Sequence, residues 1–153
     1  MIAYFDTSAV VPLLVAEPGS TRAAALWDGA DRVVSVRLIY PGARAALAQA
    51  ERLGRLTARQ LRDAVTEFES LFEAIDLVEV DDVLARRAGE LAEVRQLRGY
   101  DAVHLAAADR VRDPDVVVVA GDGALLAAAA AEGFSVAELR DLDRETCAST
   151  QGR

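Results

Sequence analysis

The chain has 153 residues, of which 52% are hydrophobic, and a net charge of −8 at pH 7. This length suits one domain with a sizeable core, and the acidic balance argues against a nucleic-acid binder that relies on bulk positive charge. The apolar runs are too short for a transmembrane span, the N-terminus lacks the features of a signal peptide, and the single cysteine, Cys147, has no internal partner, so we expect a protein of the reducing cytoplasm.

The first half of the chain predicts two strands separated by helices. A strand at 2–5 precedes a helix over 7–16, and a short helix through Trp27 leads to a second strand at 32–36. A helix from about 38 to 53 stops at Gly54, and a further helix starts at Thr57, where Thr57 and Gln60 have the spacing of a capping box.

The second half continues the alternation of strands and helices. We predict, in order, a strand at 74–80, a helix at 81–97 with Leu84, Leu91 and Val94 as its apolar positions, a break at 98–100, a helix at 101–112, a β-branched strand at 115–120, a helix at 122–133 and a strand at 134–139. This order predicts an α/β fold of three layers, with a mainly parallel sheet between helices. We expect a single domain at 1–140 and a polar tail at 141–153.

Three aspartates are the candidate site residues. Asp6 directly follows the first strand, Asp122 follows the strand at 115–120, and Asp101 opens a helix. Each could simply be a helix N-cap. However, ligands of open parallel sheets bind at the carboxyl ends of the strands, and carboxylates gathered there repel one another unless a cation lies between them.

Oxygen ligands with open positions suit Mg²⁺ or Mn²⁺, which activate water and stabilise the leaving oxygen in phosphodiester hydrolysis. Thr7 and Ser8 can add a hydroxyl ligand or hold a bound water. Glu17 also lies near this end of the chain, but the sequence does not assign it a role.

All 17 basic residues are arginines, and they are unevenly distributed. The segment 37–62 contains six arginines against one acid, Glu51. The arginines either form solvated helix faces or contact phosphates or a partner. In the second case the candidates for RNA binding are Arg37, Arg44, Arg52 and Arg55.

The sequence lacks the catalytic or binding residues that several other classes of protein require. His104, the only histidine, lies three residues after Asp101 and is interpreted as a packed core residue rather than a catalytic base. There is no lysine for a phosphotransferase or receiver domain, no glycine-rich nucleotide loop and no nucleophile-elbow motif.

The stretches "YFDTSAVV", "RGYDAVHLAAA" and "VVVVAGDGALLAAA" resemble the motifs of the PIN-domain ribonucleases, and specifically of VapC-like toxins from toxin–antitoxin pairs. The resemblance extends to about residue 140. It implies a PIN-like fold and an acidic site at Asp6, Asp101 and Asp122 that holds Mg²⁺ or Mn²⁺ for RNA cleavage. It also implies a homodimer neutralised by a small antitoxin whose C-terminal segment crosses the active-site face.

One position departs from the family pattern. In similar proteins the segment that reads "LIYPGARAAL" here carries a glutamate two residues before Arg44, and this chain has Gly42 in that place. Glu51 is roughly 13 Å farther along the helix, too far to replace it. The glycine reflects either a naturally degraded site or a laboratory substitution that silences a toxic enzyme; we favour the second, because only one residue of the motif set is missing.

Two functional hypotheses follow. The first is a metal-dependent endoribonuclease toxin whose activity is lost or impaired in this chain because Gly42 supplies no ligand. The alternative is a non-catalytic PIN-like module that still dimerises and binds an antitoxin.

Overall fold

A five-stranded parallel sheet forms the centre of the molecule. The computed structural model describes residues 1–139, and in it the strand order is β3-β2-β1-β4-β5 with every neighbouring pair parallel. The strands are β1 (Ile2–Phe5), β2 (Arg32–Val36), β3 (Asp76–Val78), β4 (Val116–Ala120) and β5 (Ser135–Glu138). The predicted tail at 141–153 and the domain boundary at residue 140 lie outside the described residues.

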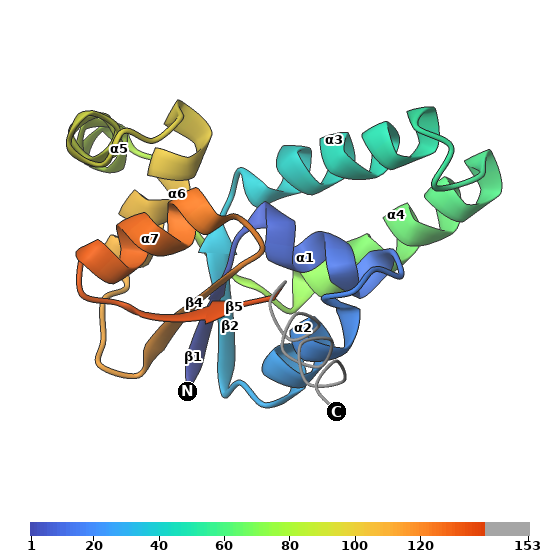
Figure 1. Cartoon of the computed structure of the whole chain (residues 1–153), viewed down its shortest axis with the longest axis horizontal. Coiled ribbons are helices and arrows are strands. Elements are labelled where there is room, and N and C mark those ends of the chain that lie inside the picture. The colour runs from blue at the N-terminus through green and yellow to red at the C-terminus, as the bar shows by residue number, and fades with distance from the viewer. Residues whose placement is uncertain (140–153) are drawn as a thin grey trace, which may run out of the picture.

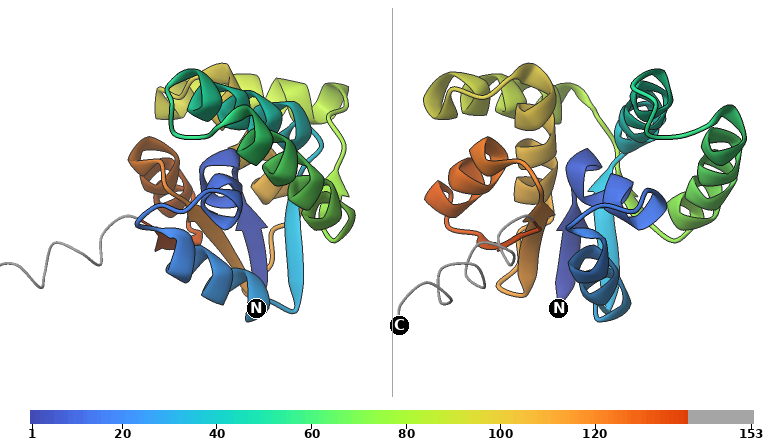
Figure 2. Two further views of the ribbon diagram at one scale, coloured as in Figure 1. Left: turned by 90° about the vertical axis from the view of Figure 1, so that its right-hand side faces the viewer. Right: turned by 45° about the vertical axis from the view of Figure 1, so that its right-hand side comes forward.

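Helices cover both faces of this sheet (Figure 1), which confirms the predicted three layers. They are α1 (Thr7–Leu14), α2 (Ser20–Asp28), α3 (Ile39–Arg52), α4 (Ala58–Glu73), α5 (Asp82–Arg95), α6 (Gly99–Arg110) and α7 (Gly123–Ala131). Helices α1 to α4 lie on one side and α5 to α7 on the other (Figure 2). In residues 1–139 we find no helix with the length and apolarity needed to cross a bilayer.

Alternate side chains of β1 belong to two separate hydrophobic cores, one on each face of the sheet. Ala3 and Phe5 pack with residues of α1 to α4, such as Phe68, whereas Tyr4 packs on the other face with residues of α5 to α7, such as Leu105. Successive side chains of a strand point to opposite faces, so a strand buried on both sides must be apolar throughout. This explains the unbroken apolar sequence of β1 and β4.

Local signals in the sequence identified most element boundaries. The capping box of Thr57 and Gln60 is confirmed, with both reciprocal hydrogen bonds present, and Gly54 ends the α3 segment with φ of 76°. The third strand, expected at 74–80, is only three residues long.

Two expectations in the α5–α6 region were wrong. The stretch 98–100 is not a break that ends before Asp101, because α6 already begins at Gly99. Val94, taken as an apolar position of α5, is 67% exposed, whereas Leu84 and Leu91 are buried. The apolar side of α5 is therefore narrower than the sequence suggested, because Leu84, Ala88 and Leu91 are its buried residues.

The sheet order determines where a ligand can bind. The chain adds β2 and β3 on one side of β1 and β4 and β5 on the other, so helices leave β1 and β4 toward opposite faces. Phe5 at the end of β1 lies beside Val119 near the end of β4. Such a switch point leaves a crevice outside the carboxyl ends of the strands.

Candidate active site

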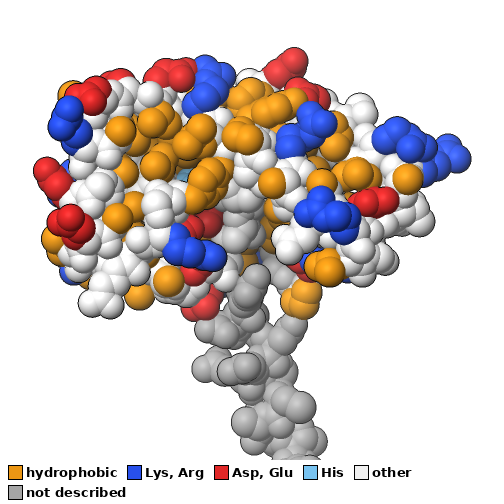
Figure 3. All heavy atoms as spheres, turned by 90° about the horizontal axis from the view of Figure 1, so that it is seen from above, with side chains coloured by type: hydrophobic (Ala, Val, Ile, Leu, Met, Phe, Trp, Pro, Cys, Tyr) orange, Lys and Arg blue, Asp and Glu red, His pale blue; other side chains and the backbone are white. Residues whose placement is uncertain are grey.

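A cavity of about 480 Å³ lies at this switch point and is lined by all three predicted aspartates, Asp6, Asp101 and Asp122. They come from the β1–α1 junction, the first turn of α6 and the β4–α7 junction, which are far apart in the sequence. Seen from the carboxyl end of the strands (Figure 3), acidic and basic side chains lie next to one another around the centre of the face.

Asp6 is the most buried of the three, with 3% of its surface exposed. It is the N-cap of α1, and its Oδ1 accepts a hydrogen bond from the Ala9 amide at 3.0 Å. Burial, together with the negative charge of Asp101, raises the pKa of Asp6 to about 7, although hydrogen bonds from Ser8 and Ala9 oppose the shift. The fold therefore holds a carboxyl group here that is easily protonated near neutral pH.

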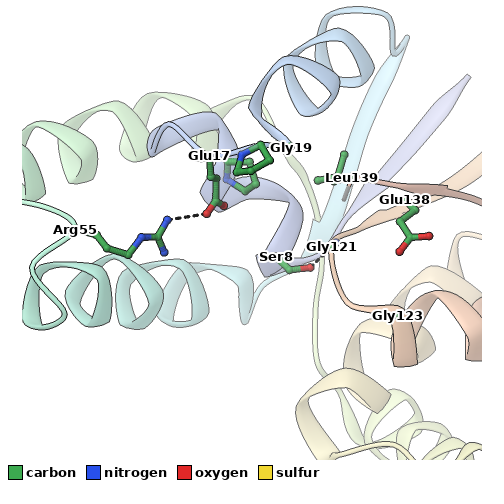
Figure 4. Close-up of a pocket in the computed structure, with 10 residues that line it drawn as sticks. Ser8, Glu17, Gly19, Arg55, Gly121, Gly123, Glu138 and Leu139 are labelled. Atoms are coloured by element: carbon green, nitrogen blue, oxygen red, sulfur yellow. Dashed lines mark hydrogen bonds and ion pairs between the residues drawn. The ribbon is translucent and has the colours of Figure 1, made fainter. Parts of the chain in front are cut away.

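Ser8 joins the two strand ends that carry Asp6 and Asp122. Its hydroxyl donates to the Asp6 carboxylate, with oxygen–oxygen distances of 2.7 and 2.9 Å, and accepts a hydrogen bond from the Gly121 amide at 2.8 Å. Figure 4 shows Ser8 pointing toward Gly121 from the start of α1. The sequence suggested that Ser8 supports a ligand or water; in the structure its contacts are to the protein itself.

Asp122 caps α7, with its Oδ1 accepting from the Ala124 amide at 2.9 Å. Asp101 is not a cap, which corrects the sequence-based view that it opens its helix. The N-cap of α6 is Arg98, and Asp101 lies within the first turn. Burial and the charge of Asp122 raise the pKa of Asp101, while Arg98 lowers it. The repulsion expected among these carboxylates is therefore present.

Arg98 lies against this acidic group and was not identified from the sequence. Its Nε is 3.4 Å from Asp101 Oδ2, and its Nη2 is 3.8 Å from Asp122 Oδ2. The side chain is 84% exposed, so it reaches over the cavity from the rim. No motif marks this residue, because its role depends on the meeting of α6 with the β4–α7 junction.

Gly42 lies in the first part of α3, and the phenol of Tyr100 fills the space beside it. A Cβ atom at position 42 would collide with the Tyr100 hydroxyl and lie 2.7 Å from Thr7 Oγ1. The Tyr100 hydroxyl also donates to the Leu38 carbonyl. The missing glutamate thus leaves no void in this structure, and a side chain at this position requires Tyr100 to move.

His104 is buried behind the aspartates, with 1% of its surface exposed, as expected of a core residue. Its Nδ1 lies 3.0 Å from the Tyr4 hydroxyl, and its Nε2 lies 3.5 Å from Thr7 Oγ1. Burial lowers the pKa of His104 to about 4, so the ring is neutral at pH 7. Thr7 lines the cavity, and its hydroxyl also contacts His104 and Tyr100.

The arginines of segment 37–62 are dispersed rather than gathered at the cavity. Arg55 lines the cavity and pairs at 2.8 Å with Glu17, which also lines it; Figure 4 shows this ion pair. Arg37 pairs with Glu79, and Arg44 contacts the Tyr40 hydroxyl at 2.8 Å between α3 and α4. Arg52 is not among the residues that line the cavity.

Glu17, which the sequence left unassigned, lines both the acid cavity and an adjoining cavity of about 640 Å³. Arg55 and Ser8 line both as well, so the two hollows meet at these residues. A chain-like substrate that passes the aspartates would therefore meet the ion pair between Glu17 and Arg55.

The chemistry of the three carboxylates suits a hard divalent cation, which prefers oxygen ligands. Within residues 1–139, however, no three acidic, histidine or cysteine side chains are close enough together to hold an ion as they stand. Arg98 pairs with two of the aspartates, and Gly42 contributes no ligand. A cation here would have to draw the acids together and displace Arg98, so we expect its binding to be weak.

Comparisons with known proteins identify the family to which the chain is similar. The model of the PIN domain family matches residues 3–131. Two ribonucleases of Mycobacterium tuberculosis, VapC45 of strain CDC 1551 and VapC49 of strain H37Rv, are each 48% identical over 136 residues, which is 89% of this chain and 94% of each relative.

Solved structures show the same fold at lower identity. Mycobacterium tuberculosis VapC20, described as a toxin that cleaves the sarcin–ricin loop, has a TM-score of 0.64 at 20% identity, over 86% of this chain and 95% of that one. FitAcB from Neisseria gonorrhoeae has a TM-score of 0.66 at 17% identity, over 93% and 100%. VapBC2 from Rickettsia felis, bound to promoter DNA, has a TM-score of 0.60 at 12% identity, over 90% and 98%.

Proposed function

This chain belongs to the PIN-domain family of VapC-like ribonuclease toxins, and from that premise we propose that its acid cavity is the site of an endoribonuclease that hydrolyses RNA phosphodiester bonds. The observation that carries the proposal is the convergence of Asp6, Asp101 and Asp122, from three separate segments, on one cavity at the switch point of the sheet. The 48% identity to two ribonucleases supports the same activity.

We further propose that Asp6, Asp101 and Asp122 hold Mg²⁺ or Mn²⁺. When bound, such an ion activates water and stabilises the leaving oxygen. The protein's own contribution is orientation: the Ser8 hydroxyl and the Ala9 amide fix the Asp6 carboxylate. Because the pKa of Asp6 is about 7 without an ion, its carboxylate form, and hence its ability to act as a ligand, increases with pH through the neutral range.

The same geometry suggests that this chain is impaired. Three carboxylates remain where the family pattern implies four, and the Tyr100 phenol occupies the space that a side chain at position 42 would need. Metal catalysis depends on fixed ligand positions, so a missing ligand lowers both affinity and rate. We therefore propose that the unaltered chain cleaves RNA slowly or not at all.

The partners are proposed from the relatives. Several similar structures are toxin–antitoxin complexes, which supports a cognate antitoxin for this chain. We propose a cytoplasmic homodimer, which light scattering of the purified protein would reveal as twice the monomer mass. A monomeric mass at micromolar concentration would contradict the dimer.

A paired cleavage assay tests the proposed activity. The unaltered chain and Gly42→Glu are incubated with ribosomal and transfer RNA in Mg²⁺, in Mn²⁺ and in EDTA. We expect cleavage by Gly42→Glu only with the cations, and its loss when Asp6→Asn is added to that variant. Binding of an antitoxin without cleavage by any variant would instead favour the alternative, a non-catalytic PIN-like module.

A further inference from the structure

We propose that Arg98 is the resident counter-ion of the acid cavity in the cation-free protein, and that its guanidinium moves to an RNA phosphate when Asp101 and Asp122 turn to a divalent cation. The inference rests on the function proposed above. Arg98 thus has two successive partners at one site: first the carboxylates of Asp101 and Asp122, and then a phosphate of the RNA.

The position of Arg98 makes the first role possible. It precedes α6 as its N-cap, and its side chain makes no capping hydrogen bond, so the guanidinium is not needed by the helix. It reaches Asp101 on the same helix and Asp122 on the β4–α7 junction. These two carboxylates repel each other, and a positive group between them lowers that repulsion.

The contacts of Arg98 are loose enough to be exchanged. Its nitrogen–oxygen distances of 3.4 and 3.8 Å exceed the roughly 2.7–2.9 Å of a strong charge-assisted hydrogen bond. The side chain is also 84% exposed, and exposed ion pairs contribute little to stability. A divalent cation that takes the same carboxylates repels the guanidinium, so the two positive groups exclude each other.

The released guanidinium remains at the rim of the cavity. Among the residues that line it, the two arginines are Arg55 and Arg98. Arg55 is held by Glu17 at 2.8 Å, whereas Arg98 gives up its contacts with Asp101 and Asp122 in the exchange. A guanidinium with its donors free, beside carboxylates that hold a cation, fits the phosphate oxygens of a nucleic-acid strand.

Calorimetric titration with Mn²⁺ tests the first role. The proteins are the unaltered chain, Arg98→Gln and Arg98→Lys, and Arg86→Gln as the matched control, because Arg86 pairs with Asp82 at 2.8 Å on the exposed side of α5. We expect Arg98→Gln to bind Mn²⁺ about two- to fivefold more tightly than the unaltered chain, which is the range an exposed ion pair supports. Arg98→Lys is expected to lie between them, and Arg86→Gln to show no change.

Fluorescence anisotropy with a short single-stranded RNA tests the second role. In EDTA the unaltered chain and Arg98→Gln should bind RNA about equally, because Arg98 is held by the acids. In Mn²⁺ the variant should bind severalfold more weakly, with a salt slope reduced by about 0.7–1, the value for one lost phosphate contact. The RNA is checked on a gel after each titration.

Arg98→Gln is expected to bind Mn²⁺ more tightly and RNA more weakly. These opposite changes distinguish the proposal from a purely structural role of Arg98, because a misfolded variant would lose affinity for both ligands. Equal or weaker Mn²⁺ binding by Arg98→Gln overturns the inference and leaves the proposed function standing. If neither the unaltered chain nor Gly42→Glu binds Mn²⁺, the proposed metal site fails and the inference fails with it.

Discussion

Gly42 and Tyr100 share one small space at the edge of the acid cavity. Glycine in a helix is about 1 kcal/mol less favourable than alanine, so an alanine at position 42 would normally stabilise the protein. Here the added Cβ would collide with the Tyr100 hydroxyl, which is held by the Leu38 carbonyl. The conformational gain of the substitution is therefore opposed by a displaced side chain.

This packing predicts how Gly42→Ala changes the free energy of unfolding. Gly42→Ala should give none of the roughly 1 kcal/mol expected from helix propensity, measured as the free energy of unfolding in urea. Gly89→Ala in α5 is the matched control, because nothing lies within 4 Å of its Cβ, and it should show the full gain. A Tyr100→Leu background removes the phenol but leaves Thr7 Oγ1 2.7 Å from the added Cβ, so Gly42→Ala should be less unfavourable there than in the unaltered chain. Equal gains from both alanines in the unaltered chain would refute the packing argument.

Asp6 predicts a dependence of stability on pH. Its pKa of about 7 in the folded protein exceeds the ordinary 3.8, so the folded state binds its proton more tightly than the unfolded state does. The free energy of unfolding therefore falls as pH rises from about 4 to about 7. Asp6→Asn, which can still cap α1, should stabilise the protein at pH 8 by on the order of a few kcal/mol and have little effect at pH 4.

Asp81 serves as a control for Asp6, because it is also a helix N-cap but its pKa is lowered rather than raised. It caps α5, and its hydrogen bonds with Arg110 lower its pKa to about 2. Its contribution is present above the ordinary pKa and is lost as pH falls toward 2, so Asp81→Asn should destabilise at neutral pH and have a smaller effect in acid. Thermal unfolding of both variants across pH gives the measurement. A parallel pH dependence of the two would contradict the burial argument for Asp6.

At the scale of elements, one hydroxyl joins β1 to β4 beyond the end of their ladder. The Ser8 hydroxyl accepts from the Gly121 amide and donates to Asp6. Ser8→Ala should speed hydrogen exchange at the Gly121 amide and lower stability by about 1 kcal/mol, the usual net value of such a hydrogen bond.

Ser20→Ala is the matched control for the Ser8 experiment. The Ser20 hydroxyl also contacts two backbone groups, the Glu17 amide and the Val15 carbonyl, but in the loop before α2. It should leave exchange at Gly121 unchanged. If Ser8→Ala and Ser20→Ala give the same exchange rate at the Gly121 amide, the Ser8 hydroxyl does not link the ends of β1 and β4.

The elements also show which parts of the site were predictable. Asp6 and Asp122 could be placed from the sequence, because each follows a strand and parallel strands bring their carboxyl ends to one edge. Arg98, Glu17 and the packing of Tyr100 on Gly42 could not. Each depends on which segments, distant in the sequence, the fold brings together, and local periodicity carries no such information. The start of α6 was misplaced because its first residue is a glycine and its N-cap has no capping side chain.

At the scale of the whole molecule, the fold brings three separate segments, which carry Asp6, Asp101 and Asp122, to one end of the sheet. The chain as a whole is acidic, with a net charge of −8. The RNA substrate proposed above would have to approach this acidic protein through local positive groups rather than through a general attraction by its net charge. Arg55 and Arg37 each pair with an acid, Glu17 and Glu79 respectively, but of the two Arg55 alone lines the cavity. We expect Arg55→Gln to weaken RNA binding and lower its salt slope, and Arg37→Gln to change neither. Equal effects of the two would indicate diffuse attraction.

We expect Asp6, Asp101 and Asp122 to act together on one cation. Crystals of the unaltered chain and of Gly42→Glu grown with Mn²⁺ allow the anomalous signal of the ion to be located directly. We expect one strong peak in Gly42→Glu, contacting all three aspartates and the introduced carboxylate, with Tyr100 displaced, and a weaker peak at the same place in the unaltered chain. A Gly42→Glu structure with no peak at the cavity, and with Arg98 still on Asp101 and Asp122, would contradict this expectation.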